Sequence, residues 1–87
     1  MAASRTIAHA TRDLFARNLR RLRQELGLTQ EALSQESGLR QAHLSEAEAG
    51  KRNVSLDNIS AIAHGLGVPV SRLFEEAPPR RSARTVA

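Results

Sequence analysis

The sequence predicts an all-α domain built from five helices. Apolar residues recur at intervals of three and four along most of the chain, which is typical of amphipathic helices. Threonine or serine precedes some of these segments and glycine follows them, as at helix ends. With 87 residues and 40% hydrophobic content, the chain suffices for one small core. We expect the folded domain over residues 11–76, between a flexible arm at 1–10 and a disordered basic tail at 77–87.

The first helix is expected to begin at about Thr11 and to end at Gly27. Along it, apolar residues spaced by four, three and four positions form a stripe for the core: Phe15, Leu19, Leu22 and Leu26. The other face carries three arginines, namely Arg17, Arg20 and Arg21. They would lie either against a phosphate backbone or in solvent, and the pattern alone favours solvent.

The second and third helices are expected on either side of a tight turn. Thr29 is suited to cap the second helix, and Gly38 can take the left-handed conformation that ends it. A third helix follows from Arg40 to Ala49, and Gly50 closes it. Its inner face is expected to consist of Leu44, Ala47 and Glu48. The opposite face is short, polar and free of large apolar residues.

The fourth helix is expected to begin after Ser55, whose hydroxyl group can cap it. Gly65 and Gly67 weaken and then end this helix. A last short helix follows Val68-Pro69-Val70 and runs to Phe74, because proline is tolerated at a helix start. The apolar face of the fourth helix is expected to comprise Leu56, Ile59, Ile62, Ala63 and Leu66.

Several spaced features of the central segment agree with one family. They are the string Leu28-Thr29-Gln30-Glu31, then Leu33, Ser37-Gly38-Leu39, and Leu44-Ser45-x-x-Glu48-x-Gly50. In these features the chain resembles phage-repressor and xenobiotic-response-element-type (XRE) regulators, over roughly Phe15 to Phe74. The segment from Arg52 to Ile59 is similar to the small controller proteins of restriction–modification systems. The resemblance implies a compact phage-repressor-like helix-turn-helix domain.

The resemblance also implies that the third helix reads base edges in the DNA major groove. Gln41 could make two hydrogen bonds to adenine, and Ala42 could touch a thymine methyl group. Arg40 could reach guanine, and Glu46 could accept a hydrogen bond from cytosine N4. Among these residues we expect Gln41 to be the principal reader. The full set of expected base-reading residues is Arg40, Gln41, Ala42, His43, Ser45 and Glu46.

Phosphate contacts are expected around the start of the second helix and after the third. Gln30 stands where backbone N–H groups at a helix start are free to meet an anion. Lys51 and Arg52 follow the third helix and are suited to clamp the DNA backbone, with Asn53 beside them. The alternative for Lys51 and Arg52 is an ordinary solvated loop.

A structural ion pair between Arg23 and Glu48 is also implied by the resemblance, and it would hold the first and third helices together. Three positions depart from the family's pattern. Arg40 cannot accept a backbone N–H as a helix cap, and Ala47 removes packing volume where a bulky apolar residue is common. Glu46 brings a negative charge to the expected DNA face.

A dimer is expected because one recognition helix covers only a few base pairs. Two copies related by a two-fold axis would read a near-palindromic site. We expect the dimer surface late in the chain, at Val68, Val70, Leu73 and Phe74. These residues would form either a self-complementary patch or the closure of the monomer core, and the sequence favours neither.

The formal net charge of +4 resides in the flanks. Residues 11–76 hold nine basic and nine acidic side chains, so net charge is no argument for DNA binding by the domain. The three histidines are far apart and no cysteine accompanies them, so we expect no metal site. We also expect no catalytic site, no cofactor, no membrane span and no export signal, which fits a cytoplasmic protein.

These observations together predict a non-enzymatic, sequence-specific transcriptional regulator that binds double-stranded DNA as a homodimer. Control of its own promoter is one option. The alternative is a protein-interaction module on the same scaffold, such as an antitoxin or an adaptor. Its partner, a toxin or RNA polymerase, is not identified by the sequence. Glu46, Ala47 and the neutral charge of the domain favour this alternative.

Overall fold

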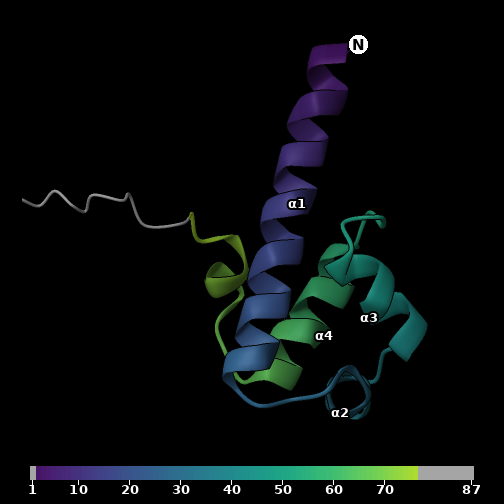
Figure 1. The fold of residues 1–87 in the computed structure, drawn as a ribbon, viewed down its shortest axis with the longest axis vertical. Helices are drawn as coiled ribbons and strands as arrows, with labels where there is room; N and C mark the ends of the chain where they lie inside the picture. Colours follow the sequence, from purple (N-terminus) through teal and green to yellow (C-terminus); the bar gives the residue numbers. More distant parts are fainter. Residues whose placement is uncertain (1, 77–87) are drawn as a thin grey trace, which may run out of the picture.

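The computed structural model describes the backbone of residues 2–76 and the side chains of residues 7–76. Along the chain come α1 (Ala2–Glu25), α2 (Gln30–Ser37), α3 (Gln41–Glu48), α4 (Leu56–Leu66) and the 3-10 helix η1 (Val70–Phe74). No strand occurs within residues 2–76, and the predicted all-α class is confirmed. The fifth helix is a 3-10 turn (Figure 1). The basic tail predicted at 77–87 lies outside the described residues.

Helix α1 begins at Ala2, whereas the sequence pattern predicts a start at about Thr11. The segment 2–10 contains four alanines and neither glycine nor proline. Alanine is the strongest helix former, so the helix can extend without support from tertiary packing. Its first turns project past the rest of the molecule (Figure 1). Flexibility of the arm at 1–10 stays a prediction, but its backbone is helical from Ala2 onward.

Side-chain caps and glycines set the ends of α2 and α4, as predicted. The Thr29 hydroxyl oxygen accepts a hydrogen bond from the Ala32 amide at 2.9 Å, and Ser55 accepts one from the Asn58 amide at 3.1 Å. Gly38 ends α2 in the left-handed conformation, with φ of 78°. Arg40 precedes α3 without a side-chain cap, as its lack of an acceptor requires.

The core lies between α1, α2, α3, α4 and η1. Two residues predicted for apolar stripes lie outside it: Leu26 is 50% exposed and Leu56 is 81% exposed. Leu26 follows the last residue of α1, and Leu56 is the first residue of α4, so each stands at a helix end. The buried cluster consists of Phe15, Leu19, Leu22, Leu33, Leu44, Ala47, Ile59, Ile62, Ala63, Leu66 and Leu73.

Helices α2 and α4 approach each other closely at Gly65. A methyl group at this position would lie 2.9 Å from Leu33 Cδ1 and 3.1 Å from the Ser37 backbone nitrogen. These separations are shorter than van der Waals contact, so only glycine fits without a shift. From its residue type, Gly65 is expected to weaken α4. The structure shows that it also allows α2 and α4 to pack.

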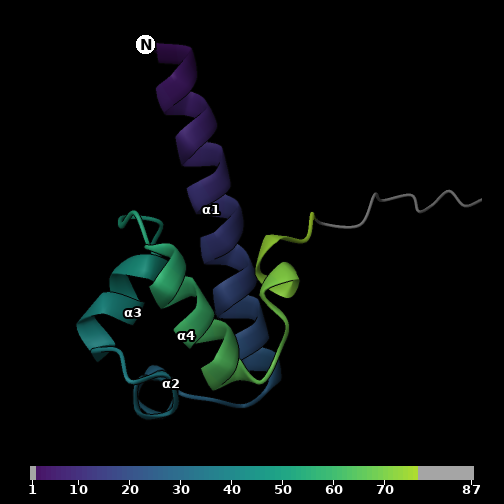
Figure 2. The same cartoon turned by 180° about the vertical axis from the view of Figure 1, so that it is seen from behind.

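Asn18 attaches η1 to α1, a role that no sequence pattern predicts. This side chain is buried, and its amide nitrogen donates to the carbonyl oxygens of Leu73 at 3.0 Å and Glu75 at 2.9 Å. The Phe15 and Phe74 rings pack with centroids 5.5 Å apart. Figure 2 shows η1 lying along α1. The end of the described chain is therefore held by two hydrogen bonds and an aromatic contact.

Candidate nucleic-acid interface

The turn between α2 and α3 is fixed by its own side chains. Ser34 donates from its hydroxyl group to the Leu39 carbonyl oxygen, and the Leu39 amide donates to the Ser37 hydroxyl oxygen at 3.2 Å. Gly38 supplies the left-handed residue between them. These bonds satisfy backbone groups at the end of α2 and fix where α3 begins.

An ion pair between Arg23 and Glu48 joins α1 to the end of α3. Arg23 Nε lies 2.5 Å from Glu48 Oε2, and Arg23 Nη2 lies 3.0 Å from Oε1, so the pair is bidentate. Glu48 is only 5% exposed. The hydrogen bond to Glu48 raises the pKa of Arg23, and the charge of Glu48 acts in the same direction. Arg20 also donates to the Glu48 carbonyl oxygen at 3.2 Å.

Gln30 belongs to the same network. Its amide nitrogen donates to Glu48 Oε1 at 3.1 Å. This contact directs the amide at the start of α2, where a phosphate contact was predicted, and leaves the amide oxygen and one N–H for another partner. Glu48 therefore holds Arg23 on α1 and Gln30 on α2 in one cluster, and it positions α3 relative to both helices.

The outward face of α3 carries most of the predicted base-reading residues. Five of them are exposed: Arg40, Gln41, Ala42, Ser45 and Glu46. His43 differs because its side chain is half-buried, and its Nε2 atom is buried without a hydrogen-bond partner among the described residues. Burial lowers the pKa of His43, the charge of Arg52 lowers it further, and Glu46 acts in the opposite direction. His43 therefore offers the neutral form of imidazole at neutral pH.

Glu46 and Arg52 form an ion pair that is not among the pairs predicted from sequence. Arg52 donates to Glu46 Oε1 from Nε at 2.9 Å and also from Nη2. The pair lies at the surface, with 40% of the Arg52 side chain and 50% of the Glu46 side chain exposed. Two residues with separate predicted roles, a base contact and a phosphate contact, are thus joined. The negative charge of Glu46 is compensated on the protein itself.

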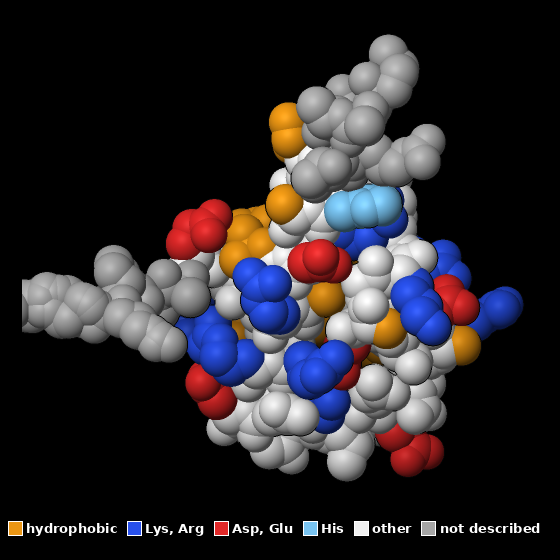
Figure 3. All heavy atoms as spheres, turned by 45° about the horizontal axis from the view of Figure 1, so that its top comes forward, with side chains coloured by type: hydrophobic (Ala, Val, Ile, Leu, Met, Phe, Trp, Pro, Cys, Tyr) orange, Lys and Arg blue, Asp and Glu red, His pale blue; other side chains and the backbone are white. Residues whose placement is uncertain are grey.

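The loop after α3 holds the remaining predicted phosphate contacts. Lys51 and Asn53 are exposed, and Gly50 turns the chain with φ of 73°. A methyl group on Gly50 would lie 2.9 Å from Asp13 Oδ1, so the loop passes close to α1. On the face shown in Figure 3, basic side chains lie beside acidic ones and form no continuous basic surface. In this loop, Arg52 is paired with Glu46.

The four residues predicted for the dimer surface lie in different environments. Leu73 is fully buried, while Val68 and Phe74 are half-buried and pack against the core. Only Val70 is largely exposed, at 42%. Closure of the monomer core thus accounts for Leu73 and for much of Val68 and Phe74. Val70 and the exposed part of Phe74 are what this segment can offer to a partner.

Other kinds of site find little support in the described part of the chain. Residues 7–76 contain no cluster of three or more histidine, aspartate or glutamate side chains that could hold a metal ion. None of the described helices combines the length and apolarity that a bilayer crossing needs.

Helices α2 and α3 form a helix-turn-helix, and α3 presents its polar face outward. This arrangement defines a DNA-binding protein of the helix-turn-helix class. Proteins of this class are not enzymes. The chain belongs to the HTH_3 (Helix-turn-helix) family, whose model matches residues 19–73. It is a DNA-binding transcriptional regulator of the controller-protein type.

Proteins of similar sequence and structure support this assignment. The chain is 41% identical over 63 residues to control protein C.MunI from Mycoplasma sp, a match that covers 71% of this chain and 85% of that protein. It is 40% identical over 63 residues to control protein C.BamHI from Bacillus amyloliquefaciens, covering 71% and 78%. The crystal structure of the restriction-modification controller protein C.AhdI from Aeromonas hydrophila superposes with a TM-score of 0.72 and 42% identity, covering 75% of this chain and 98% of that one.

Proposed function

We propose that the protein is a homodimer that binds a near-palindromic operator and regulates transcription, including that of its own gene. The observation that carries the proposal is the exposed polar face of α3, held in place by the Arg23, Gln30 and Glu48 cluster. A helix that enters a groove must be rigid, and it must present small or polar side chains to base edges. Action on DNA would place the protein in the cytoplasm.

Base reading is assigned to Arg40, Gln41, Ala42, Ser45 and Glu46, with His43 as a half-buried neighbour. Gln41 is exposed at the first position of α3, so its amide can make paired hydrogen bonds with an adenine edge. Phosphate contacts are assigned to Gln30, Lys51, Arg52 and Asn53. One similar structure is that of the restriction-modification controller protein C.AhdI, which supports a role for this chain in controlling restriction–modification genes.

The alternative function, a protein-interaction module, rested partly on the negative charge of Glu46. That charge is paired with Arg52, so it does not stand alone on the α3 face. The pairing weakens the reason to expect a protein partner there in place of DNA. We therefore retain DNA as the partner for this face.

The test is competition between the DNA upstream of the gene and random duplex, measured across a salt series. We expect the preference for the upstream DNA to persist at moderate salt, with two protected half-sites about 34–36 Å apart on one face of the DNA. Equal and steeply salt-dependent binding to both DNAs would leave only attraction to phosphates. That outcome would reject sequence-specific regulation and would favour a protein partner.

A further inference from the structure

The first turns of α1 project away from the rest of the described chain (Figure 1). They project from the same end of the molecule as the loop between α3 and α4, whereas α2 lies at the opposite end (Figures 1 and 2). Ile7 lies on this extension and is 68% exposed. The match to the family model begins at residue 19, which lies after this extension. A single exposed apolar side chain is ordinary on a protein surface, so Ile7 is informative only together with the features beside it.

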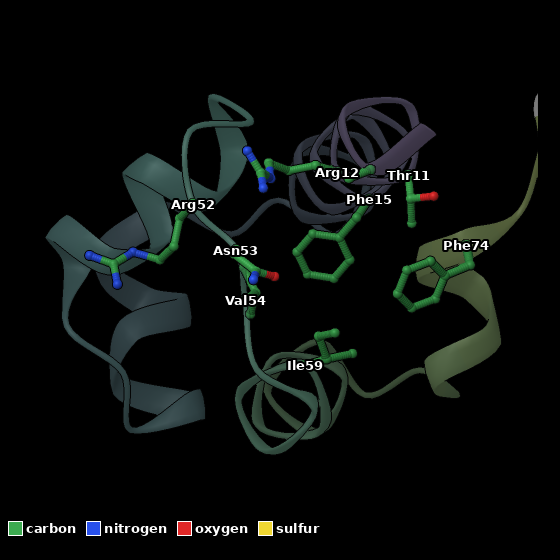
Figure 4. A pocket seen from close by; sticks show the side chains of 9 residues that line it. Thr11, Arg12, Phe15, Arg52, Asn53, Val54, Ile59 and Phe74 are labelled. Carbon is green, nitrogen blue, oxygen red and sulfur yellow. The ribbon is translucent and has the colours of Figure 1, made fainter. Parts of the chain in front are cut away.

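A pocket of about 270 Å³ opens beside this extension. Figure 4 shows the Phe15, Ile59 and Phe74 side chains pointing toward one another around it. Ala8 and Thr11 border it from α1, and Val54 borders it from the loop before α4. The pocket is therefore lined largely by apolar groups from four segments of the chain. It is wide enough to accept an aliphatic side chain.

We propose that Ile7 of one copy enters this pocket in a second copy, and that the converse contact closes a two-fold dimer. This inference rests on the homodimer of the proposed function and identifies its surface. An isologous interface requires a patch that complements itself. Here an exposed apolar side chain lies next to an apolar pocket. Ile7 precedes the pocket residue Thr11 by four positions, which is about one turn of α1.

Neighbouring residues fit a close approach of two α1 helices. Ala8, Ala10 and Thr11 are small, so the backbones of two crossing helices could come near each other. None of the exposed α3 residues proposed to read bases lines the pocket, so this contact leaves the base-reading face of α3 free. Phe74 belongs to the dimer surface predicted from sequence and also borders the pocket. The predicted dimer surface and the pocket are therefore adjacent.

The interface also touches the region proposed to bind phosphates. Arg52 and Asn53 line the same pocket, and Arg52 is paired with Glu46 on α3. A second copy seated at this point would therefore restrict the loop after α3. Dimer formation and ordering of the phosphate contacts would then be coupled.

The experiment is sedimentation velocity of the full chain over a concentration series, with folding checked by circular dichroism. Ile7→Asp should raise the dimer dissociation constant at least about 100-fold, since two buried isoleucines are lost per dimer. Leu26→Asp is the matched control, because Leu26 is also exposed and follows the other end of α1, and it should leave the constant unchanged. Ala8→Trp tests the pocket instead, since the bulky ring would fill it from its own chain while Ile7 stays intact.

The outcomes separate this inference from the proposed function. A wild-type dimer that becomes monomeric with both Ile7→Asp and Ala8→Trp supports the proposal. A dimer that survives Ile7→Asp, or that is broken only by Val70→Asp, would contradict the proposed contact of Ile7 with the pocket. Neither result would contradict the proposed function as a dimeric regulator. A wild-type chain that is monomeric in solution and binds half-sites independently would overturn both.

Discussion

Glu46 and Arg52 are held together across the end of α3, and both nitrogens of Arg52 that make this contact donate to the same carboxylate oxygen, Oε1. The arrangement leaves Glu46 Oε2 and Arg52 Nη1 free of this contact. Each residue therefore restrains the other and keeps one polar group outside the pair. An arginine held by a carboxylate is a weaker general phosphate clamp than a free arginine, because its charge is largely compensated.

Replacing Glu46 with glutamine should release Arg52 for phosphate binding. We expect tighter binding to random duplex, a salt dependence steeper by about one phosphate contact, and poorer discrimination of the operator. The measurement is a salt series with operator and random DNA. Glu36→Gln is the control, because Glu36 is an exposed acid of α2 with no ion pair among the described residues. An equal effect of both substitutions would show that only net charge matters.

Replacing Glu48 with alanine should destabilise the fold far more than replacing Glu46. The change strands the largely buried guanidinium group of Arg23, which typically costs about 3–5 kcal/mol. The exposed pair of Glu46 and Arg52 should contribute less than about 1 kcal/mol. Urea unfolding of the two alanine variants checks the contrast. Similar midpoints for both would mean that the Glu48 cluster does not anchor α3.

Replacing Gln41 with alanine should reduce operator preference without changing stability, because the residue is exposed at the start of α3. Loss of a paired contact with a base typically costs about 1–3 kcal/mol of discrimination. Binding to random duplex should stay the same, since no phosphate contact is assigned to this side chain. If affinity for both DNAs fell equally, Gln41 would be a general DNA contact and not a base reader.

Replacing Gly65 with alanine should lower the free energy of unfolding even though alanine favours helices. The gain in helix propensity is about 1 kcal/mol, whereas overpacking typically costs about 1–3 kcal/mol. The added methyl group meets the Ser37 backbone nitrogen as well as Leu33, so a smaller residue at position 33 would relieve only part of the strain. Ser60→Ala, at an exposed position of α4, is the comparison by thermal unfolding. A stabilised Gly65→Ala variant would contradict the close approach of α2 and α4.

Local signals explain which parts of the fold could be predicted from sequence. Thr29, Ser55 and Gly38 act within a few residues of their own positions, so their roles at helix ends follow from residue type and spacing. Periodicity identified most of the core but not its limits. Leu26 and Leu56 fit the apolar spacing, yet they stand where no neighbouring helix covers them, and spacing carries no information about where a neighbour ends.

Contacts between distant segments were harder to predict. Asn18 binds carbonyl groups 55 and 57 positions away, and an asparagine in an arginine-rich helix gives no sign of that role. The pair of Glu46 and Arg52 spans a loop whose path depends on Gly50. The ion pair of Arg23 and Glu48 was expected only because of the family resemblance, since 25 residues separate its members.

The half-buried His43 should make stability depend on pH. Burial and the charge of Arg52 hold its pKa in the folded state below the ordinary value of 6.5. Between that lowered pKa and 6.5, the unfolded chain binds more protons than the folded one. The free energy of unfolding should therefore fall as pH decreases below about 6.5, and the full contribution should be present above it.

The measurement compares urea unfolding of the wild type and His43→Gln from pH 7.5 to pH 5. The variant should lose less stability on acidification, because glutamine binds no proton there, and His9 and His64 are common to both proteins. Arg52→Gln should also reduce the loss, since it removes one cause of the lowered pKa. Identical pH profiles for wild type and His43→Gln would mean that proton binding at His43 is the same in the folded and unfolded chains.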